Sequence, residues 1–408
     1  MSDLYAFKKK ISAIDMEEEL LMIPGPVPVI PRIREAMSKP VIHHRGEEFA
    51  AMYVEIVEDL KNVFQTENDL FVLSGSGTCA MEAAIGNLIR RSNGRGKPEM
   101  ACITITNGKF GERFKEIAER YGAETVTPAH FEWGYPIELE RVKEALENSR
   151  QPKVITMVHN ETSTGILNPV KEVGKLAKEH DAVFVLDCIT SIGGDEVPVD
   201  RLGVDIAIVG SQKCLGTPPG LSAISVSERA LNLMRENQSR PYYMDLLAYK
   251  KSFEKKQTPY TPALPLFFGL KEALEVIREE GMARRIERHR ILSKAVRTAV
   301  TSMGLSLFPK LNEVSNYSNT VTAINIPLAN GITDEQIRGG MKKKGVIVAG
   351  GQEKLKGKIF RIATMGNITG SDVLRAIEAL EQVLKDNKFI EKEGTVTAEA
   401  KEVLSTVR

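Results

Sequence analysis

Three groups of residues have types and positions that could do chemistry, and the first is a glycine-rich turn. Ser74-Gly75-Ser76-Gly77-Thr78 follows the apolar run Leu70–Leu73 and precedes a segment with apolar residues at helical spacing. Bare N–H groups at the positive end of a helix dipole form an anion site, for which phosphate is the natural ligand. Such turns also occur merely to make a tight connection, and neither GxGxxG nor a Walker motif is present.

The other two groups are single residues, each directly after an apolar strand-like run. Asp187 ends the run at 182–186, at a strand end where α/β sheets bind ligands, although an Asp there can also cap a turn. Lys213 follows Ile208-Val209-Gly210 in a Gly/Ser turn. Burial of an ammonium is costly and lowers its pKa toward neutrality, which makes such a lysine a Schiff-base nucleophile and proton shuttle. One strand and its connection separate the two residues, so both could face one crevice.

An anion cradle, an amine and a carboxylate together match the needs of pyridoxal phosphate (PLP). The phosphate requires the helix N-terminus, the aldehyde requires the amine, and the pyridine nitrogen requires a carboxylate that keeps it protonated and the ring an electron sink. We therefore expect PLP as the cofactor. No cluster of His, Asp or Glu has metal-ligand spacing, so we expect no metal.

The elements that must position these residues alternate between short β-branched runs and longer amphipathic stretches from about residue 70 onward. This alternation predicts the α/β class, with a mainly parallel sheet covered by helices. Several runs are apolar throughout, as strands buried on both faces should be. The strand candidates are Leu70–Leu73, Ala101–Thr106, Thr125–Thr127, Val154–Val158, Val183–Leu186, Ile206–Val209 and Ala223–Val226.

The pattern changes near residue 270 and predicts a second, smaller α/β lobe. Gly269–Met303 reads as one long helix kinked at Gly281, with its charged run RRIERHR as a solvated face and His289 at the surface. The lobe continues with strand and helix candidates Thr320–Asn325, Asp334–Lys344, Val346–Val348, Ile359–Ala363 and 371–385. We therefore divide the chain into an N-terminal arm (1–22), a large PLP-binding domain (23–270) and a small C-terminal domain (271–408).

Composition excludes several other classes of protein. The 408 residues carry 55 Lys and Arg against 54 Asp and Glu, so the net charge of +1 gives no reason to expect a nucleic-acid or membrane partner. Apolar runs fall far short of the about 20 residues that a membrane helix needs, and the first 21 residues lack a signal-peptide core. Four cysteines lie far apart without a CxxC pair, which favours a reducing cytoplasm.

Several short motifs occur along the chain, and their order and spacing together are highly specific. They are Ile23-Pro24-Gly25-Pro26, His43-His44-Arg45, Ser74-Gly75-Ser76-Gly77, His159-Asn160-Glu161-Thr162-Ser163-Thr164-Gly165, Asp187, Ser211-Gln212-Lys213 and Phe360-Arg361-Ile362. With these motifs the sequence resembles the class V aminotransferases of fold type I, and within them the alanine–glyoxylate and serine–pyruvate aminotransferase branch. The resemblance covers nearly the whole chain. It implies a large domain with a mainly parallel seven-stranded sheet and a smaller C-terminal α/β domain.

The resemblance also implies a role for each site residue that binds the cofactor. Lys213 would hold PLP through a Schiff base, and Asp187 would pair with the pyridine nitrogen. Thr162 would hydrogen-bond the ring hydroxyl, and Phe110 would stack on the ring, where animal members commonly carry Trp. The phosphate would be bound by Ser76, Gly77, Thr78 and Gln212, with Thr261 reaching over from a second subunit. Thr78 stands where animal members carry His.

For the substrate, the resemblance implies that Arg361 clamps the α-carboxylate and that Gly25 leaves room beside it, although PGP can equally be a plain turn. The implied activity is ping-pong transamination by a homodimer, from alanine or serine to glyoxylate or pyruvate. Aspartate:2-oxoglutarate transamination is an alternative that needs a second cation, for which Arg45 and Arg240 are candidates. A PLP-dependent lyase or kynureninase-like hydrolase and a non-catalytic PLP-binding protein are further alternatives. A cysteine desulfurase is disfavoured because no cysteine follows Cys214.

Overall fold

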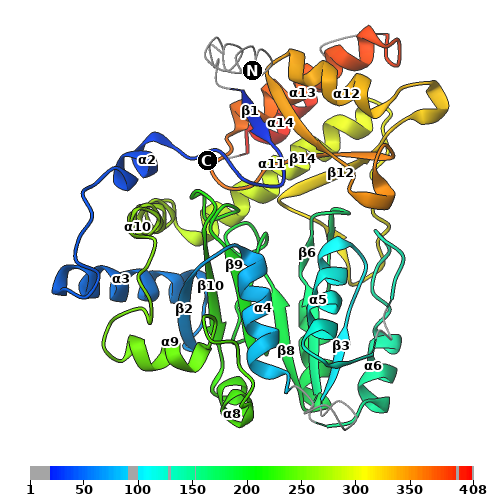
Figure 1. Ribbon diagram of the computed structural model, residues 1–408. Coiled ribbons are helices and arrows are strands. Elements are labelled where there is room, and N and C mark those ends of the chain that lie inside the picture. Colours follow the sequence, from blue (N-terminus) through cyan, green and yellow to red (C-terminus); the bar gives the residue numbers. More distant parts are fainter. Residues whose placement is uncertain (1–18, 91–99, 127–129, 152, 392–394, 407–408) are drawn as a thin grey trace, which may run out of the picture.

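The computed structural model describes residues 19–90, 100–126, 130–151, 153–391 and 395–406. Figure 1 shows a large sheet with helices on both of its faces, and a smaller sheet with its own helices above one end of it. No helix in the described ranges is long and apolar enough to cross a membrane. The α/β class and the fold type I architecture expected from the sequence are confirmed.

The large sheet has seven strands in the order β2-β10-β9-β8-β5-β3-β4. Only β10 runs antiparallel to its neighbours. The strands are β2 (Asp69–Ser74), β3 (Ala101–Thr104), β4 (Glu124–Val126), β5 (Lys153–Val158), β8 (Ala182–Asp187), β9 (Ile206–Gly210) and β10 (Leu221–Val226). All seven predicted strands are therefore present, although Thr127, the end of one of them, lies outside the described residues.

Both faces of the large sheet are buried, which explains why its strands are apolar throughout. In β8, for example, Phe184 and Leu186 join one hydrophobic cluster while Val183 and Val185 join the other. Helices cover both faces and fill the connections. They are α3 (Glu47–Phe64), α4 (Gly77–Leu88), α5 (Lys109–Arg120), α6 (Leu139–Asn148), α7 (Val170–Glu179), α8 (Glu228–Glu236), α9 (Leu246–Phe253) and α10 (Leu264–Glu280).

A second core lies in the smaller lobe, under a sheet of four strands in the order β1-β13-β14-β12. The strands are β1 (Leu20–Met22), β12 (Val321–Asn325), β13 (Val346–Gly350) and β14 (Ile359–Ala363). Its helices are α11 (Met282–Ser302), α12 (Asp334–Lys343), α13 (Gly370–Asp386) and α14 (Thr395–Leu404). Strand β1 comes from the predicted N-terminal arm, and the predicted boundary at residue 270 falls inside α10, so the division into domains stays a prediction.

Some short elements were not predicted from the sequence. A three-stranded sheet in the order β11-β7-β6 joins a loop of the large lobe to the small one, because β11 (Asn316–Tyr317) pairs with β7 (Ile166–Leu167) beside β6 (Asn160–Glu161). Helix α2 (Pro31–Met37) and the 3-10 turns η1 (Leu328–Asn330) and η2 (Glu353–Leu355) complete the described elements.

The helix predicted over Gly269–Met303, with a kink at Gly281, is in fact two helices that meet at that glycine. The prediction of a solvated face holds for Arg284, Glu287 and Arg290 but was wrong for Arg285, and the prediction of His289 at the surface was wrong. Helices α10 and α11 are separate because Gly281 between them has a φ of +79°, a left-handed conformation that favours glycine. Within RRIERHR, Arg285 and His289 are fully buried. Arg285 donates to Cys214 O (2.6 Å) and to Glu280, and His289 Nε2 accepts from Gly366 N (3.1 Å).

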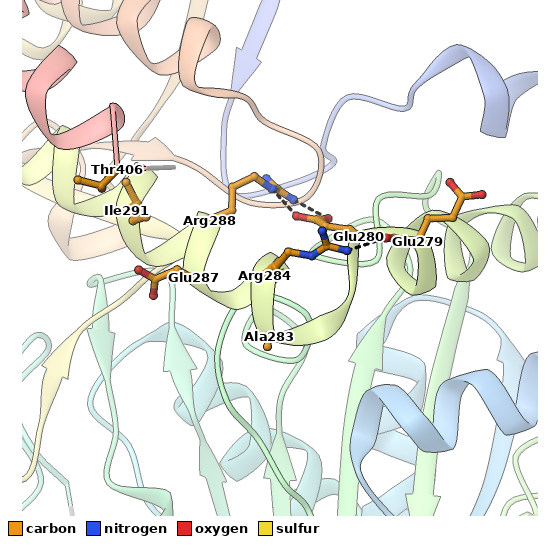
Figure 2. A pocket seen from close by; sticks show the side chains of 8 residues that line it. All are labelled: Glu279, Glu280, Ala283, Arg284, Glu287, Arg288, Ile291 and Thr406. Carbon is orange, nitrogen blue, oxygen red and sulfur yellow. Dashed lines mark hydrogen bonds and ion pairs between the residues drawn. The ribbon is translucent and has the colours of Figure 1, made fainter. Parts of the chain in front are cut away.

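A cavity of about 500 Å³ lies where α10 meets α11 (Figure 2). Residues of both charges line it, including Glu279, Glu287 and Arg284, and Arg288 forms an ion pair with Glu280 across its wall. The other acidic side chains there pair outside the cavity lining, Glu279 with Arg32 and Glu287 with Arg290. The buried Arg285 connects this helix junction to Cys214, the residue after Lys213.

Candidate active site

Lys213 and Asp187 meet at the carboxyl edge of the large sheet. Asp187 ends β8, and β9, which precedes Lys213, is its parallel neighbour, with Asp187 opposite Ile208 in the register. Both side chains line one pocket. Its lining consists of Ser76, Gly77, Thr78, Phe110, Arg113, Val158, Asn160, Thr162, Asp187, Ile189, Thr190, Gln212 and Lys213. Parallel strands thus place the predicted amine and carboxylate in one crevice.

The N-terminus of helix α4 forms the end of this pocket that suits an anion. Ser76 is the N-cap, and its side chain makes no capping hydrogen bond to the first turn. Gly77 packs so closely on Ile189 that a Cβ there would lie 2.4 Å from Ile189 Cδ1. The first turn can therefore present N–H groups and the positive helix end to a phosphate.

Lys213 is packed against the segment that contains Pro24 and Gly25. Its Nζ donates a hydrogen bond to Pro24 O, and a Cβ at Gly25 would lie 2.5 Å from that Nζ. Burial lowers the pKa of Lys213 to about 8, against small opposing effects of nearby negative groups. Gly25 therefore makes room for the lysine in this structure. A lysine with this pKa is largely neutral in mildly alkaline solution, as a nucleophile must be.

Asp187 is 3% exposed, and one of its oxygens accepts from Ile189 N at 2.7 Å. Burial raises the pKa of this carboxyl to about 7, with the Ile189 hydrogen bond acting in the opposite direction. A cation placed beside the carboxylate would favour its charged form. The site is therefore suited to a protonated nitrogen of a bound ring.

Helix α5 brings Phe110 to the pocket, and a buried carboxylate holds the start of this helix. Glu161 is fully buried and accepts from Phe110 N (3.0 Å) and Gly111 N (3.1 Å). A Cβ at Gly108 would lie 2.2 Å from Glu161 Cγ, so this approach requires glycine. The Phe110 ring is thereby fixed at the pocket wall, together with the next residue on the same helix face, Arg113.

Thr162 and Arg361 lie next to each other although they come from different lobes. Thr162 lines the pocket, and its carbonyl accepts from Arg361 Nη1 at 2.9 Å. The other side of the guanidinium donates to Gly350 O, from Nε at 3.1 Å and Nη2 at 2.8 Å. Arg361 is 5% exposed, and burial lowers its pKa to about 10. It lies behind Thr162 and is not among the residues that line the pocket.

Comparison with known proteins gives the family. The model of the family "Aminotransferase class-V" matches residues 33–376. The chain belongs to the class V aminotransferases. An uncharacterised aminotransferase of Methanocaldococcus jannaschii is 44% identical over 96% of this chain and 99% of its own. Among solved structures, ureidoglycine–glyoxylate aminotransferase of Bacillus subtilis has a TM-score of 0.88 at 32% identity, over 97% of this chain and 100% of that one. Alanine–glyoxylate aminotransferase of Nostoc has a TM-score of 0.83 at 33% identity, over 91% and 97%.

Class V aminotransferases depend on PLP, and the pocket of this aminotransferase fits that cofactor. The N-terminus of α4, the amine of Lys213 and the carboxylate of Asp187 lie in one pocket. Two buried oxygens of its lining, Gln212 Oε1 and Asn160 Oδ1, have no hydrogen-bond partner within the described structure. Unpaired buried polar atoms are costly, so a polar ligand in this pocket would satisfy them.

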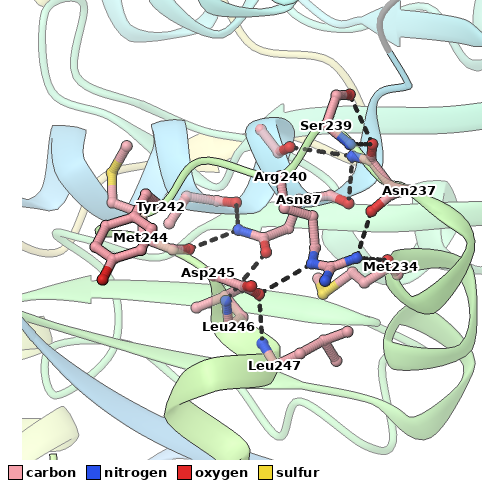
Figure 3. A network of polar contacts seen from close by, with 12 residues as sticks. Asn87, Met234, Asn237, Ser239, Arg240, Tyr242, Met244, Asp245, Leu246 and Leu247 are labelled. Carbon is pink, nitrogen blue, oxygen red and sulfur yellow. Dashed lines mark hydrogen bonds and ion pairs between the residues drawn. The ribbon is translucent and has the colours of Figure 1, made fainter. Parts of the chain in front are cut away.

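Gly25 and Arg361 contact lining residues without lining the pocket themselves, and three further predicted residues, Thr261, Arg45 and Arg240, are not among its lining either. Thr261 is exposed at the surface, as a residue that serves a second subunit would be, and its role stays a prediction. Arg45 donates to Gln257 and to the carbonyls of Thr258 and Pro259. In the network of Figure 3, Arg240 pairs with Asp245 at 3.0 Å and donates to backbone carbonyls.

Sequence reasoning missed several residues of the lining. Asn160, Arg113 and Thr190 are the polar ones, and Val158 and Ile189 complete the wall. Asn160 belongs to the motif at 159–165, so its position two residues before Thr162 in the sequence was the available signal. No group of three or more His, Cys, Asp or Glu side chains in the described ranges could hold a metal ion.

Replacing Gly25 with Ala should displace Lys213, because the new Cβ would lie 2.5 Å from Nζ and 2.7 Å from Cδ. We expect the protein to fold but to bind PLP at least about tenfold more weakly, as measured by absorbance titration of the apoprotein. Gly122→Ala is the matched control, since Gly122 has a similar φ of +80° but no neighbour within 4 Å of a Cβ. Equal PLP affinity in the two variants would contradict the assigned contact.

The pKa of Lys213 makes PLP uptake dependent on pH. Only the neutral amine attacks an aldehyde, so the rate of covalent uptake by apoprotein should rise up to a pH of about 8 and then level off. An ordinary lysine, with a pKa of about 10.4, would give a rate that keeps rising beyond that point. Stopped-flow absorbance across this range, with a free lysine derivative as reference, makes the measurement. A rise that continues to pH 10 would show that burial does not activate Lys213.

Proposed function

We propose that this aminotransferase moves an amino group from a small L-amino acid, alanine or serine, to glyoxylate or pyruvate by ping-pong kinetics. The observation that carries the proposal is the single pocket shared by Lys213, Asp187 and the N-terminus of α4, with Arg361 directly behind its wall. A site that only stored PLP would not need a buried guanidinium beside the cofactor pocket.

Lys213 would hold PLP covalently and, once freed by the amino donor, carry the proton between the substrate α-carbon and the cofactor. Its pKa of about 8 suits both tasks, because the amine can accept and return a proton near neutrality. Bound PLP supplies an electron sink for the α-carbanion. Asp187 would keep the ring nitrogen protonated, since its carboxylate is buried in the pocket.

The remaining lining residues would hold the cofactor in place. Phosphate oxygens would accept from the first turn of α4, at Ser76, Gly77 and Thr78, and from Gln212. Phe110 would stack on the ring, and Thr162 would hydrogen-bond its hydroxyl. Each of these six residues lines the same pocket.

Arg361 would bind the substrate α-carboxylate, with Gly25 leaving space for it beside Lys213. The guanidinium is held on two sides by Thr162 O and Gly350 O, so its plane is fixed before substrate arrives. A planar fork of donors suits bidentate recognition of a carboxylate. Because the guanidinium contacts Thr162 and does not itself line the pocket, the substrate carboxylate would have to reach past Thr162 to bind it.

A small donor is favoured because the two candidate cations for a second carboxylate are engaged elsewhere. Arg240 is paired with Asp245, and Arg45 holds the 257–259 segment next to Thr261. The solved structures that resemble this chain include two that are named for reactions with glyoxylate, which supports glyoxylate as acceptor.

The assembly and location belong to the same proposal. A homodimer would let Thr261 of each subunit reach the phosphate of the other, which its exposed position permits. The four cysteines are all unpaired in the structure, which supports a reducing compartment such as the cytoplasm.

A panel of donors and acceptors tests the proposed reaction. We expect alanine or serine to convert the bound cofactor to its pyridoxamine form, and kcat/KM with glyoxylate or pyruvate to exceed that of aspartate with 2-oxoglutarate by about 100-fold. Lys213→Ala should not complete this conversion. The highest kcat/KM for aspartate would support the alternative aspartate aminotransferase. Release of ammonia without the pyridoxamine form would indicate a lyase, and no conversion with any donor would indicate a non-catalytic protein.

A further inference from the structure

We propose that Arg113 supplies the positive charge of the phosphate site. Its guanidinium would hold the Thr78 hydroxyl, which donates to a phosphate oxygen, and would also donate to the phosphate directly. The inference rests on the proposed PLP site. It adds a binding residue that comes from helix α5 and lies next to Thr78, at the end of the glycine-rich turn.

The contacts of Arg113 place its guanidinium between two residues assigned to the cofactor. Its Nη1 donates to Thr78 Oγ1 at 3.0 Å, and its Cζ lies 4.8 Å from the centroid of the Phe110 ring. Arg113 itself lines the pocket. A charged side chain held by one hydrogen bond and one aromatic face is thus present where the phosphate end of the pocket meets the ring wall.

Charge balance is the second argument. A phosphate monoester carries about −1.5 to −2 charges near neutral pH, whereas a helix N-terminus offers only about +0.5. Of the residues that line this pocket, Arg113 and Lys213 are the cationic ones, and Lys213 is required for the aldehyde. A second cation near the phosphate is therefore needed, and within this chain's lining Arg113 can supply it.

The Thr78 hydroxyl would connect the Arg113 guanidinium to the phosphate by hydrogen bonds. The hydroxyl oxygen accepts from Arg113, so its own hydrogen remains free to be donated to a phosphate oxygen. The guanidinium keeps further N–H donors for direct contact. The position where animal members of the family carry His is thus occupied by a Thr that is hydrogen-bonded to Arg113.

The guanidinium is also held in place before the cofactor binds. Glu161 accepts from the backbone N–H groups of Phe110 and Gly111 and so fixes the first turn of α5. Arg113 follows Phe110 by three residues on that helix, so both side chains face the pocket together. Little ordering of the side chain would be required when phosphate arrives.

Binding of PLP and of pyridoxal, which lacks the phosphate, by apoprotein tests the proposal. Arg113→Gln should weaken PLP binding by about 10- to 100-fold and change pyridoxal binding by less than about twofold, measured by fluorescence titration. Arg113→Lys should recover part of the loss. Arg120→Gln, an exposed arginine on the same helix, is the matched control and should leave both affinities unchanged.

Inorganic phosphate gives a second readout without any aldehyde chemistry. It should compete with PLP in the wild type and more weakly in Arg113→Gln, and Thr78→Val should add little to the loss caused by Arg113→Gln, because the two residues act as one unit. Equal losses for PLP and pyridoxal, or unchanged PLP affinity in Arg113→Gln, would overturn the inference. If the wild type itself bound no PLP, the failure would lie with the proposed cofactor site instead.

Discussion

The structure depends on the burial of two ionisable groups at the carboxyl edge of one parallel sheet. Strands β8 and β9 are neighbours, so Asp187 at the end of β8 and Lys213 shortly after β9 line the same pocket. Removal from water lowers the pKa of Lys213 and raises that of Asp187, so both groups are close to changing protonation near neutral pH. Burial of ionisable groups without full partners costs stability. Such groups occur at functional sites, where a bound ligand supplies the interactions that they lack.

Contacts from both lobes hold the residues in and next to this pocket. The Pro24–Gly25 segment, which follows a strand of the small sheet, receives the hydrogen bond of Lys213. Arg285, at the start of the long helix α11, donates to the carbonyl of Cys214, the next residue after the lysine. Arg361 of the small sheet holds the Thr162 carbonyl. Both lobes thus position the groups around one amine, which explains why the family's motifs are spread over the whole chain.

The sequence predicted those features that are local in the chain. Apolar runs predicted the strands of the large sheet because both of its faces are buried, and the strand ends predicted Asp187 and Lys213. The sequence predicted a kink at Gly281 but not the full separation of α10 from α11, because a glycine in the sequence does not reveal the positive φ that ends one helix before the next starts. A run of charges predicted a solvated face, but Arg285 is buried by carbonyls that come from residues 71 and 81 positions away.

The same reasoning explains which site residues were missed. Arg113 lies on an amphipathic helix, where an arginine is usually solvated, and its partner Thr78 is 35 residues away. Asn160 is 2% exposed because its amide donates to Thr190 O and to Thr320 Oγ1, which is 160 residues further along the chain. Neither contact follows from a local pattern. Both require the fold, since the packing of separate elements determines which polar atoms remain unpaired in the pocket.

Borohydride reduction of the PLP-loaded protein, followed by peptide mass spectrometry, tests the central claim most directly. Reduction makes the bond between a lysine and the cofactor permanent, so the site of attachment can be located by mass. The account predicts a phosphopyridoxyl group on Lys213. Attachment to another lysine, or no attachment in protein that has been saturated with PLP, would contradict it.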